Sequence, residues 1–347
     1  MKRMIAAAAA LTITAACFAS CGDSEKKDNS SSKAETTTVE STTAEDTTTE
    51  AATEVDTTEA VEEDEDENYE TGDASLDNAR NQDEIGDNEL LVISFGTSFN
   101  DSRRLTIGAI ENALEKAFPD YSVRRGFTAN IVIDHVNKRD GVLIDDIDAA
   151  LKRAVDNEVK NLVVQPTHLM NGIEYEELSA KIAEYSDAFD KVVIGEPLLT
   201  SDEDFAAVEK AITDWTKDYD DGETAICFMG HGTEAESNEV YQKMQDLLAK
   251  DGFANYYIGT VEATPSLEDV IAKVKEGNYK KVVLEPLMVV AGDHANNDMA
   301  GDEEDSWKSA FLAEGYDVEC LLRGLGENED IQKLYVEHAQ KAIDSLN

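Results

Sequence analysis

Short apolar runs alternate with amphipathic segments from about residue 89 to the end of the chain. Eight runs, most of them rich in β-branched residues, have the length and composition of buried strands. They cover residues 90–95, 121–125, 161–164, 191–194, 225–229, 256–259, 281–284 and 317–321. Strands that are apolar on both faces and separated by helices are typical of parallel sheets. The pattern therefore predicts an α/β fold.

An internal repeat divides this region into two halves. Residues 94–97 (Ser-Phe-Gly-Thr) have a counterpart in residues 228–233 (Phe-Met-Gly-His-Gly-Thr), and Val-Val-Gln-Pro at 163–166 matches Val-Leu-Glu-Pro at 283–286. Two four-stranded units are therefore favoured over a single eight-stranded sheet. We place the halves at residues 88–217 and 218–347.

The first residues have the features of an export signal. Two basic residues precede an apolar stretch, residues 4–16, that is too short to span a bilayer. The following Ala-Ser-Cys-Gly resembles a bacterial lipoprotein signal, which predicts a signal peptide over residues 1–21 and lipidation of Cys21. The protein would then be exported and anchored to the cell membrane, facing outside the cytoplasm. Cys17 is a rival lipidation site, and a plain secretory signal is the alternative.

Residues 22–87 consist mainly of Ser, Thr, Ala and acidic residues, with 23 Asp or Glu against 4 Lys or Arg. Such a segment cannot bury enough apolar surface to offset chain entropy, so it is expected to be a disordered acidic tether. The remainder of the chain is also acidic, and this field makes nucleic acid an improbable partner. Downstream, Cys227 and Cys320 lie in apolar runs and are expected to be buried side chains rather than a disulfide.

Polar residues that follow predicted strands are the candidates for chemistry. Three are histidines, His168, His231 and His294, and two are carboxylates, Glu174 and Glu262. Loops after the carboxyl ends of parallel strands form the ligand crevice of α/β folds, so a metal or acid–base site is indicated. Their spacing contains no short metal-binding motif, and a role in capping loops stays open. The other two histidines, in predicted helices, are expected to be surface or packing residues.

Three longer segments resemble the anaerobic sirohydrochlorin cobaltochelatases. They are Leu-Val-Ile-Ser-Phe-Gly-Thr-Ser at 91–98, Phe-Met-Gly-His-Gly at 228–232 and Gly-Asp-His-Ala-Asn-Asn-Asp-Met-Ala at 292–300. Shorter matches extend the resemblance, in order, over residues 89–346. The resemblance implies a class II chelatase: two similar Rossmann-like α/β domains, each a mostly four-stranded parallel sheet flanked by helices, that face each other across a cleft. It also implies metal insertion into a tetrapyrrole without ATP or another nucleotide.

The same resemblance implies roles for individual residues. His231, Glu262 and His294 match the metal-binding and catalytic residues of the family. The tetrapyrrole side of the cleft would be lined by the loop Ser94, Phe95, Gly96, Thr97 and Ser98. Many members have a further histidine a few residues past the Met-Gly-His-Gly segment, whereas this chain has Glu-Ala-Glu at 234–236. An auxiliary role at that place is therefore in doubt.

The chemistry of metal insertion fits this set of residues. Two imidazoles and one carboxylate bind Co²⁺, Fe²⁺ or Ni²⁺ and leave coordination positions open for the ring nitrogens. A base is also needed for the two pyrrole N–H protons. Sirohydrochlorin carries many carboxylates, so basic groups must offset the repulsion from the acidic protein. Three pairs of basic residues are candidates for this role, and the alternative for each pair is that its members are solvated surface charges. The candidate pairs are Arg103-Arg104, Arg124-Arg125 and Lys138-Arg139.

Two functions compete. The first is a sirohydrochlorin cobaltochelatase-like enzyme; the second is a surface lipoprotein that binds metal, haem or a corrinoid and hands it on without catalysis. The export signal favours the second, whereas the intact His/Glu/His set with its proton acceptor favours the first, which we prefer. The sequence leaves open whether the protein is a homo-oligomer.

Overall fold

The computed structural model describes residues 71–346. The predicted signal peptide, the lipidation site at Cys21 with its rival Cys17, and the tether as far as residue 70 lie outside these residues. The predicted runs in the described part form two four-stranded parallel sheets, ordered β2-β1-β3-β4 and β6-β5-β7-β8. The strands are β1 (Asn88–Ser94), β2 (Ser122–Phe127), β3 (Asn161–Pro166), β4 (Lys191–Ile194), β5 (Thr224–Gly230), β6 (Tyr256–Thr260), β7 (Lys281–Pro286) and β8 (Asp317–Cys320). The two-sheet α/β prediction is confirmed.

Each central strand is buried on both faces because alternate side chains point to different helix layers. In β1, Leu90 and Val92 pack with the residues of α2 (Ile107–Ala117). Leu91 and Ile93 pack instead with α4 (Ile147–Asp156) and α5 (Ile173–Glu184).

The second sheet repeats this arrangement. Ile226 and Phe228 of β5 pack with α7 (Glu239–Asp251), and Cys227 and Met229 pack with α8 (Leu267–Glu276) and α9 (Trp307–Ala313). Cys227 is a buried free thiol, as predicted, and Cys320 is a partly buried one.

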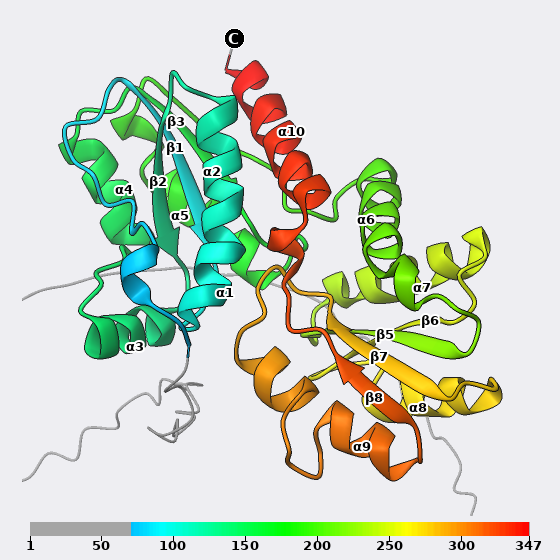
Figure 1. Cartoon of the computed structure of the whole chain (residues 1–347). Coiled ribbons are helices and arrows are strands. Elements are labelled where there is room, and N and C mark those ends of the chain that lie inside the picture. The colour runs from blue at the N-terminus through cyan, green and yellow to red at the C-terminus, as the bar shows by residue number, and fades with distance from the viewer. Residues whose placement is uncertain (1–70, 347) are drawn as a thin grey trace, which may run out of the picture. The chain divides into compact units, whose positions relative to one another are not determined.

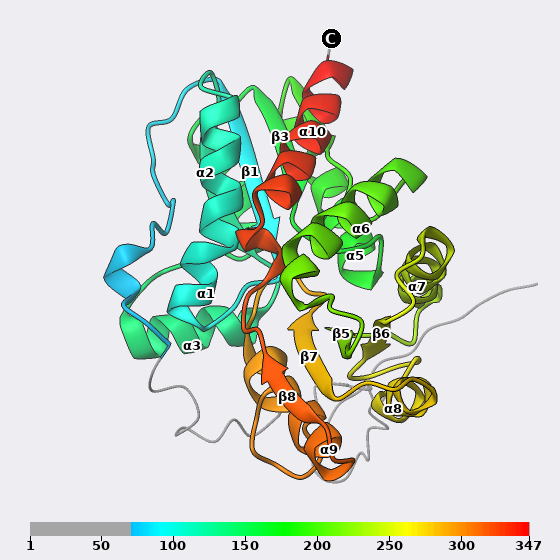
Figure 2. The same ribbon diagram turned by 45° about the vertical axis from the view of Figure 1, so that its right-hand side comes forward.

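The last helix, α10 (Glu329–Ser345), crosses back to the first sheet. It packs against α2, β3 and α6 (Asp202–Thr216), and Figures 1 and 2 show it beside α2. The Tyr335 hydroxyl donates to the Thr167 carbonyl at 2.8 Å, and His338 Nε2 lies 3.0 Å from Asp204 Oδ1. Residues 218–347 therefore do not all pack with the second sheet, and His338 is a packing residue.

Residues 71–87, here called the strap, correct the tether prediction. They include a 3₁₀ helix, η1 (Ala74–Leu76), and pack on the first half, where the side chain of Gln82 donates to the Val123 carbonyl at 2.8 Å. Arg80 is buried and pairs with Glu111 at 3.1 Å. The prediction failed here because the strap is fixed by ion pairs with distant residues, which composition does not reveal. No helix within the described range is long and apolar enough to cross a membrane.

Candidate metal and tetrapyrrole site

The second sheet brings three of the predicted residues together. His231 directly follows β5, Glu262 follows β6 by two residues, and His294 follows β7 by eight. Their candidate ligand atoms all lie within 4.8 Å of one another, the one such group of three found among residues 71–346. Atoms bound to a single ion at about 2 Å are at most about 4 Å apart, so small side-chain rotations suffice to bind one. The three side chains could therefore hold one metal ion.

Backbone contacts fix two of these side chains to each other. The amide of Glu262 donates to the carbonyl of His231 at 2.9 Å, which ties the loop after β6 to the end of β5. Gly232 has φ +90°, and a Cβ there would lie 2.9 Å from Ala263 and Thr260. Only glycine fits such a turn without strain. The turn sets His231 Nε2 3.7 Å from Glu262 Oε1.

Hydrogen bonds leave the same nitrogen free on both histidines. His231 Nδ1 lies 2.8 Å from the Gly232 carbonyl, and His294 Nδ1 lies 2.7 Å from Asp298 Oδ2. Since these oxygens accept a hydrogen bond from Nδ1–H, each Nε2 has its lone pair available for a metal. The hydrogen bond to Asp298 also raises the pKa of His294. The sequence motif at 292–300 contains Asp298 but does not reveal its role; its position four residues after His294, within one helical turn, is the signal that could have found it.

The three side chains are accessible. Their side-chain exposures are 46% for His231, 55% for Glu262 and 34% for His294, so an ion and a flat ring can both reach them. The two imidazole rings stand nearly perpendicular, at 81°, with centroids 4.7 Å apart. Rings in this orientation can accommodate an ion together with a second ligand.

His168 and Glu174 lie on the first half and are not part of this group. His168 follows β3, and its Nε2 lies 3.3 Å from Glu174 Oε2. Its side chain is almost fully buried, whereas that of Glu174 is 44% exposed. The structure thus separates the five sequence candidates into a group of three and a pair.

The predicted tetrapyrrole loop, Ser94 to Ser98, contributes one exposed apolar side chain. Phe95 is 47% exposed, whereas Ser94 and Thr97 are buried. A Cβ on Gly292 would lie 2.9 Å from Thr97 Oγ1, so this loop meets the segment that leads to His294. Of the predicted lining side chains, Phe95 is therefore the one best able to contact a ring.

Three of the proposed carboxylate-binding arginines are structural. Arg103, Arg124 and Arg125 are fully buried. Each pairs with a carboxylate: Arg103 with Asp77 at 2.7 Å, Arg124 with Glu89 at 3.3 Å, and Arg125 with Glu111 at 2.7 Å. Substrate binding and solvated surface charge are therefore both wrong interpretations for these three residues. The sequence did not reveal the ion pairs, because the carboxylate partners are distant along the chain.

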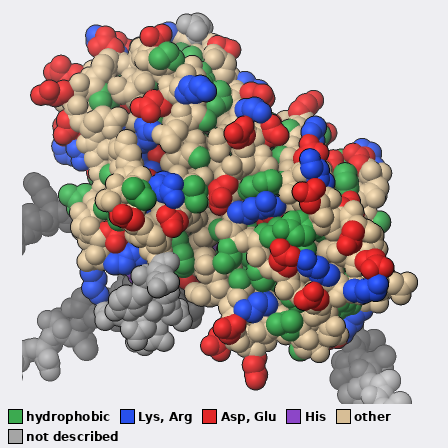
Figure 3. All heavy atoms as spheres, in the orientation of Figure 1, with side chains coloured by type: hydrophobic (Ala, Val, Ile, Leu, Met, Phe, Trp, Pro, Cys, Tyr) green, Lys and Arg blue, Asp and Glu red, His purple; other side chains and the backbone are tan. Residues whose placement is uncertain are grey.

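The remaining members of the basic pairs are more accessible. Arg104 is 35% exposed and pairs with Asp101, and Arg139 pairs with Asp140 and donates to the Ser98 carbonyl. Acidic and basic side chains are interspersed over the face shown in Figure 3.

Comparison with known proteins adds independent information. A family model described as cobalt chelatase (CbiK) matches residues 88–344. The sirohydrochlorin cobaltochelatase of Salmonella typhimurium is 34% identical over 255 residues, which are 74% of this chain and 96% of that protein. Sirohydrochlorin cobaltochelatase CbiKC of Nitratidesulfovibrio vulgaris is 28% identical over 264 residues, 74% of this chain and 91% of that protein.

Two solved structures share the fold. SirB from Bacillus subtilis with Fe³⁺ has a TM-score of 0.54 at 12% identity, covering 75% of this chain and 97% of that one. The sirohydrochlorin chelatase SirB from Bacillus subtilis subspecies spizizenii, in complex with cobalt, has a TM-score of 0.52 at 12% identity with the same coverage. At this identity the likeness concerns the fold alone.

Proposed function

The chain belongs to the cobalt chelatase (CbiK) family, and we propose that it inserts Co²⁺ into sirohydrochlorin without a nucleotide, at His231, Glu262 and His294. The observation that carries the proposal is the meeting of these three side chains within 4.8 Å, from three different strand ends. Two relatives named as sirohydrochlorin cobaltochelatases support the same metal and ring. The protein is a metal chelatase, and the ion is its substrate.

The three side chains would act as follows. His231 and His294 present their Nε2 atoms to the ion, and Glu262 adds one oxygen. Two imidazoles and one carboxylate leave coordination positions open, so ring nitrogens can replace water at the ion. Two pyrrole N–H bonds break, four metal–nitrogen bonds to the ring replace the bonds of the ion to water and protein, and two protons leave. Glu262 is half-exposed beside the ion site and accepts one of these protons, and the other passes to solvent. Phe95 packs against the ring.

Fe²⁺ and Ni²⁺ are further substrates in this proposal. Imidazole and carboxylate ligands bind these ions as well, and affinity among first-row divalent ions follows a general order that the ligand set does not override. The choice of metal then depends on supply and on geometry at the open positions.

We also propose that the chain is lipidated at Cys21 and held on the outer side of the cell membrane. The lipobox-like Ala-Ser-Cys-Gly supports this. Cys21→Ser should release the protein into the soluble fraction, and Cys17→Ser should leave it membrane-bound. Release by the Cys17 change alone would place the anchor at the other cysteine.

The decisive experiment mixes purified protein with excess sirohydrochlorin and Co²⁺ and follows the absorption change of the ring. We expect several equivalents of product per protein, and none above the uncatalysed rate with His294→Ala. A change that stops at one equivalent, with the ring retained, would instead identify a protein that binds and hands on its ligand.

A further inference from the structure

The strap, residues 71–87, precedes the part of the chain that the family model matches, which begins at residue 88. It nevertheless contacts the helix that follows the predicted tetrapyrrole loop, α1 (Asn100–Leu105). The amide of Asp101 donates to the Thr71 carbonyl at 2.7 Å, and the side chain of Asn100 donates to the Gly72 carbonyl at 3.1 Å. No side chain caps the start of this helix, so the strap backbone supplies an acceptor that the helix lacks.

The carboxylate of Asp77 is the central contact of the strap. It accepts from Arg103 Nε at 2.7 Å and from Arg125 Nη1 at 2.7 Å, and its side chain is only 4% exposed. Burial raises the pKa of Asp77, but the hydrogen bonds and charges of Arg125 and Arg103 outweigh it, so the pKa lies below its ordinary value. Asp77 is therefore a charged group with two buried cationic partners.

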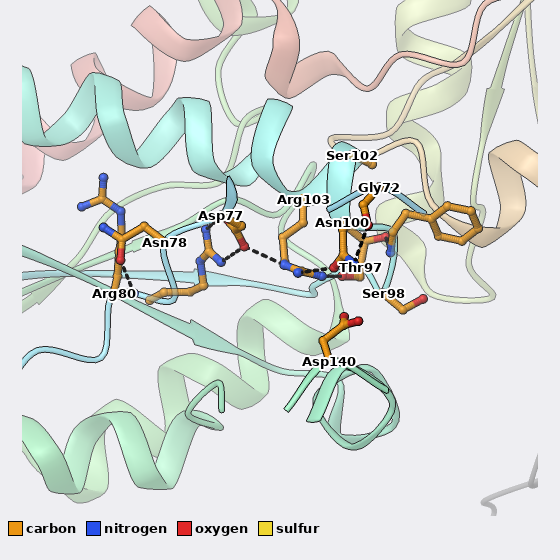
Figure 4. Close-up of polar contacts among 12 residues, drawn as sticks. Gly72, Asp77, Asn78, Arg80, Thr97, Ser98, Asn100, Ser102, Arg103 and Asp140 are labelled. Carbon is orange, nitrogen blue, oxygen red and sulfur yellow. Dashed lines mark hydrogen bonds and ion pairs between the residues drawn. The ribbon is translucent and has the colours of Figure 1, made fainter. Parts of the chain in front are cut away.

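Arg103 connects Asp77 to the Ser94–Ser98 loop. Its Nη1 donates to the Thr97 carbonyl at 3.1 Å, and its Nη2 donates to the side chain of Asn100 (Figure 4). Guanidinium is a planar donor with several fixed directions, so one arginine holds a carboxylate and a carbonyl at once. A lysine in its place cannot keep both contacts in this geometry.

The loop in turn meets the second half near the metal ligand His294. Thr97 lies against Gly292, and the Ala291 amide donates to the Ser102 hydroxyl at 3.0 Å. A continuous series of contacts thus runs from Asp77 through Arg103 to Thr97 and on to the segment before His294.

We propose that Asp77 is a positioning residue of the chelatase site: through Arg103 it fixes the Thr97 carbonyl and thereby holds the Ser94–Ser98 loop, with Phe95, in the position that receives the ring. This inference rests on the proposed function for its substrate. The strap is then part of the working domain and not only a connection to the N-terminal segment.

The test compares Asp77→Asn and Arg103→Lys with Asp83→Asn, all in the full-length chain. Asp83 belongs to the same strap, and its side chain is 62% exposed where it pairs with Arg153 at 2.8 Å. We expect the first two variants to raise KM for sirohydrochlorin about tenfold, because the loop must be ordered on binding. Their kcat and their affinity for Co²⁺ should stay within about threefold of the parent, since neither change touches the metal ligands. The control variant Asp83→Asn should leave all three quantities unchanged.

Amide hydrogen exchange gives a readout that needs no turnover. In Asp77→Asn and Arg103→Lys, peptides that cover residues 94–102 should exchange faster, while those of β3 and α4 should not. Unchanged exchange in residues 94–102, or an equal acceleration over the whole first half, would overturn the proposal. If Asp77→Asn does not fold, Arg103→Lys tests the same link with the carboxylate kept. Absence of turnover in the parent would contradict the proposed function alone, because the exchange result stands without it.

Discussion

The two halves of the domain share one topology and differ at their strand ends. Ser94 pairs with Phe127 at the end of the first sheet, as Gly230 pairs with Thr260 at the end of the second. The glycines that follow, Gly96 and Gly232, have φ of +108° and +90°. Phe95 and His231, which lie between the strand and the glycine, therefore occupy equivalent positions in the two halves.

This equivalence allows the proposed metal ligands to be compared with the first half. At the three positions where the second half has His231, Glu262 and His294, the first half has Phe95, Ala129 and Glu174. The same backbone thus presents the proposed metal ligands in one half and an exposed aromatic ring in the other. A fold fixes positions, while side-chain identity decides what each position does. The asymmetry suits a reaction that brings an ion and a flat ring together.

The largest expected effect separates the two equivalent positions. His231→Ala should weaken Co²⁺ binding by at least about 100-fold, because loss of a ligand costs more than loss of its supporting hydrogen bond. Phe95→Ala should leave Co²⁺ affinity within about threefold and raise KM for sirohydrochlorin. Titration with Co²⁺ and steady-state kinetics measure the two quantities. If both variants changed Co²⁺ affinity equally, the assignment of metal binding to His231 and of ring contact to Phe95 would be wrong.

Glu262→Gln sharpens the comparison within the metal set. The amide keeps an oxygen for the ion but cannot accept a proton, so kcat should fall about 100-fold, as for loss of a general base. Co²⁺ affinity should fall by less than about tenfold. A larger loss of affinity than of kcat would make Glu262 a ligand only. Glu174→Gln, at the equivalent of His294, is the matched control for Co²⁺ affinity.

A smaller effect is expected from Asp298→Asn. Asp298 orients His294 and raises its pKa through a hydrogen bond, while the position four residues after Glu174 is the buried Leu178. Loss of this support should weaken Co²⁺ binding about tenfold without changing the free energy of unfolding. Calorimetric Co²⁺ titration and urea unfolding measure the two. An unaltered affinity would show that His294 is held by packing instead.

The smallest expected effect concerns stability and pH. Burial raises the pKa of Glu89 to about 7, although the buried Arg124 pairs with it at 3.3 Å, and neither carboxylate oxygen accepts a hydrogen bond. The folded protein therefore holds this proton more tightly than the unfolded chain, so stability should fall as pH rises from about 4.5 to about 7. Glu89→Gln should remove this part of the pH dependence and raise the free energy of unfolding at about pH 8 by on the order of 1 kcal/mol.

The second half offers the control for that change. Burial also raises the pKa of Glu285 to about 7, but this carboxylate accepts two hydrogen bonds from Arg323. Glu285→Gln loses those bonds as well, so its gain should be smaller than that of Glu89→Gln. Urea unfolding at about pH 5 and about pH 8 compares the two. An equal gain would show that the hydrogen bonds of Glu285 contribute nothing to stability.

The sequence by itself determined the strands, their division into two halves and the residue types of the site. Buried parallel strands need apolar side chains on both faces. This requirement appears in the sequence as short continuous apolar runs, such as residues 90–95 and 225–229. The resemblance to the cobalt chelatases was likewise carried by local motifs, and the family match over residues 88–344 confirms it. Chemistry at strand ends could be expected because parallel strands end at one edge of a sheet.

Only the tertiary structure decided which distant residues meet. It placed His231, Glu262 and His294 together and left His168 on the other half, although all follow strands. It buried Arg103 against Asp77 of the strap, and it returned α10 to the first sheet. These contacts join residues far apart in sequence, and their energy depends on burial and on the partner. Neither quantity is present in the local pattern of apolar and polar residues.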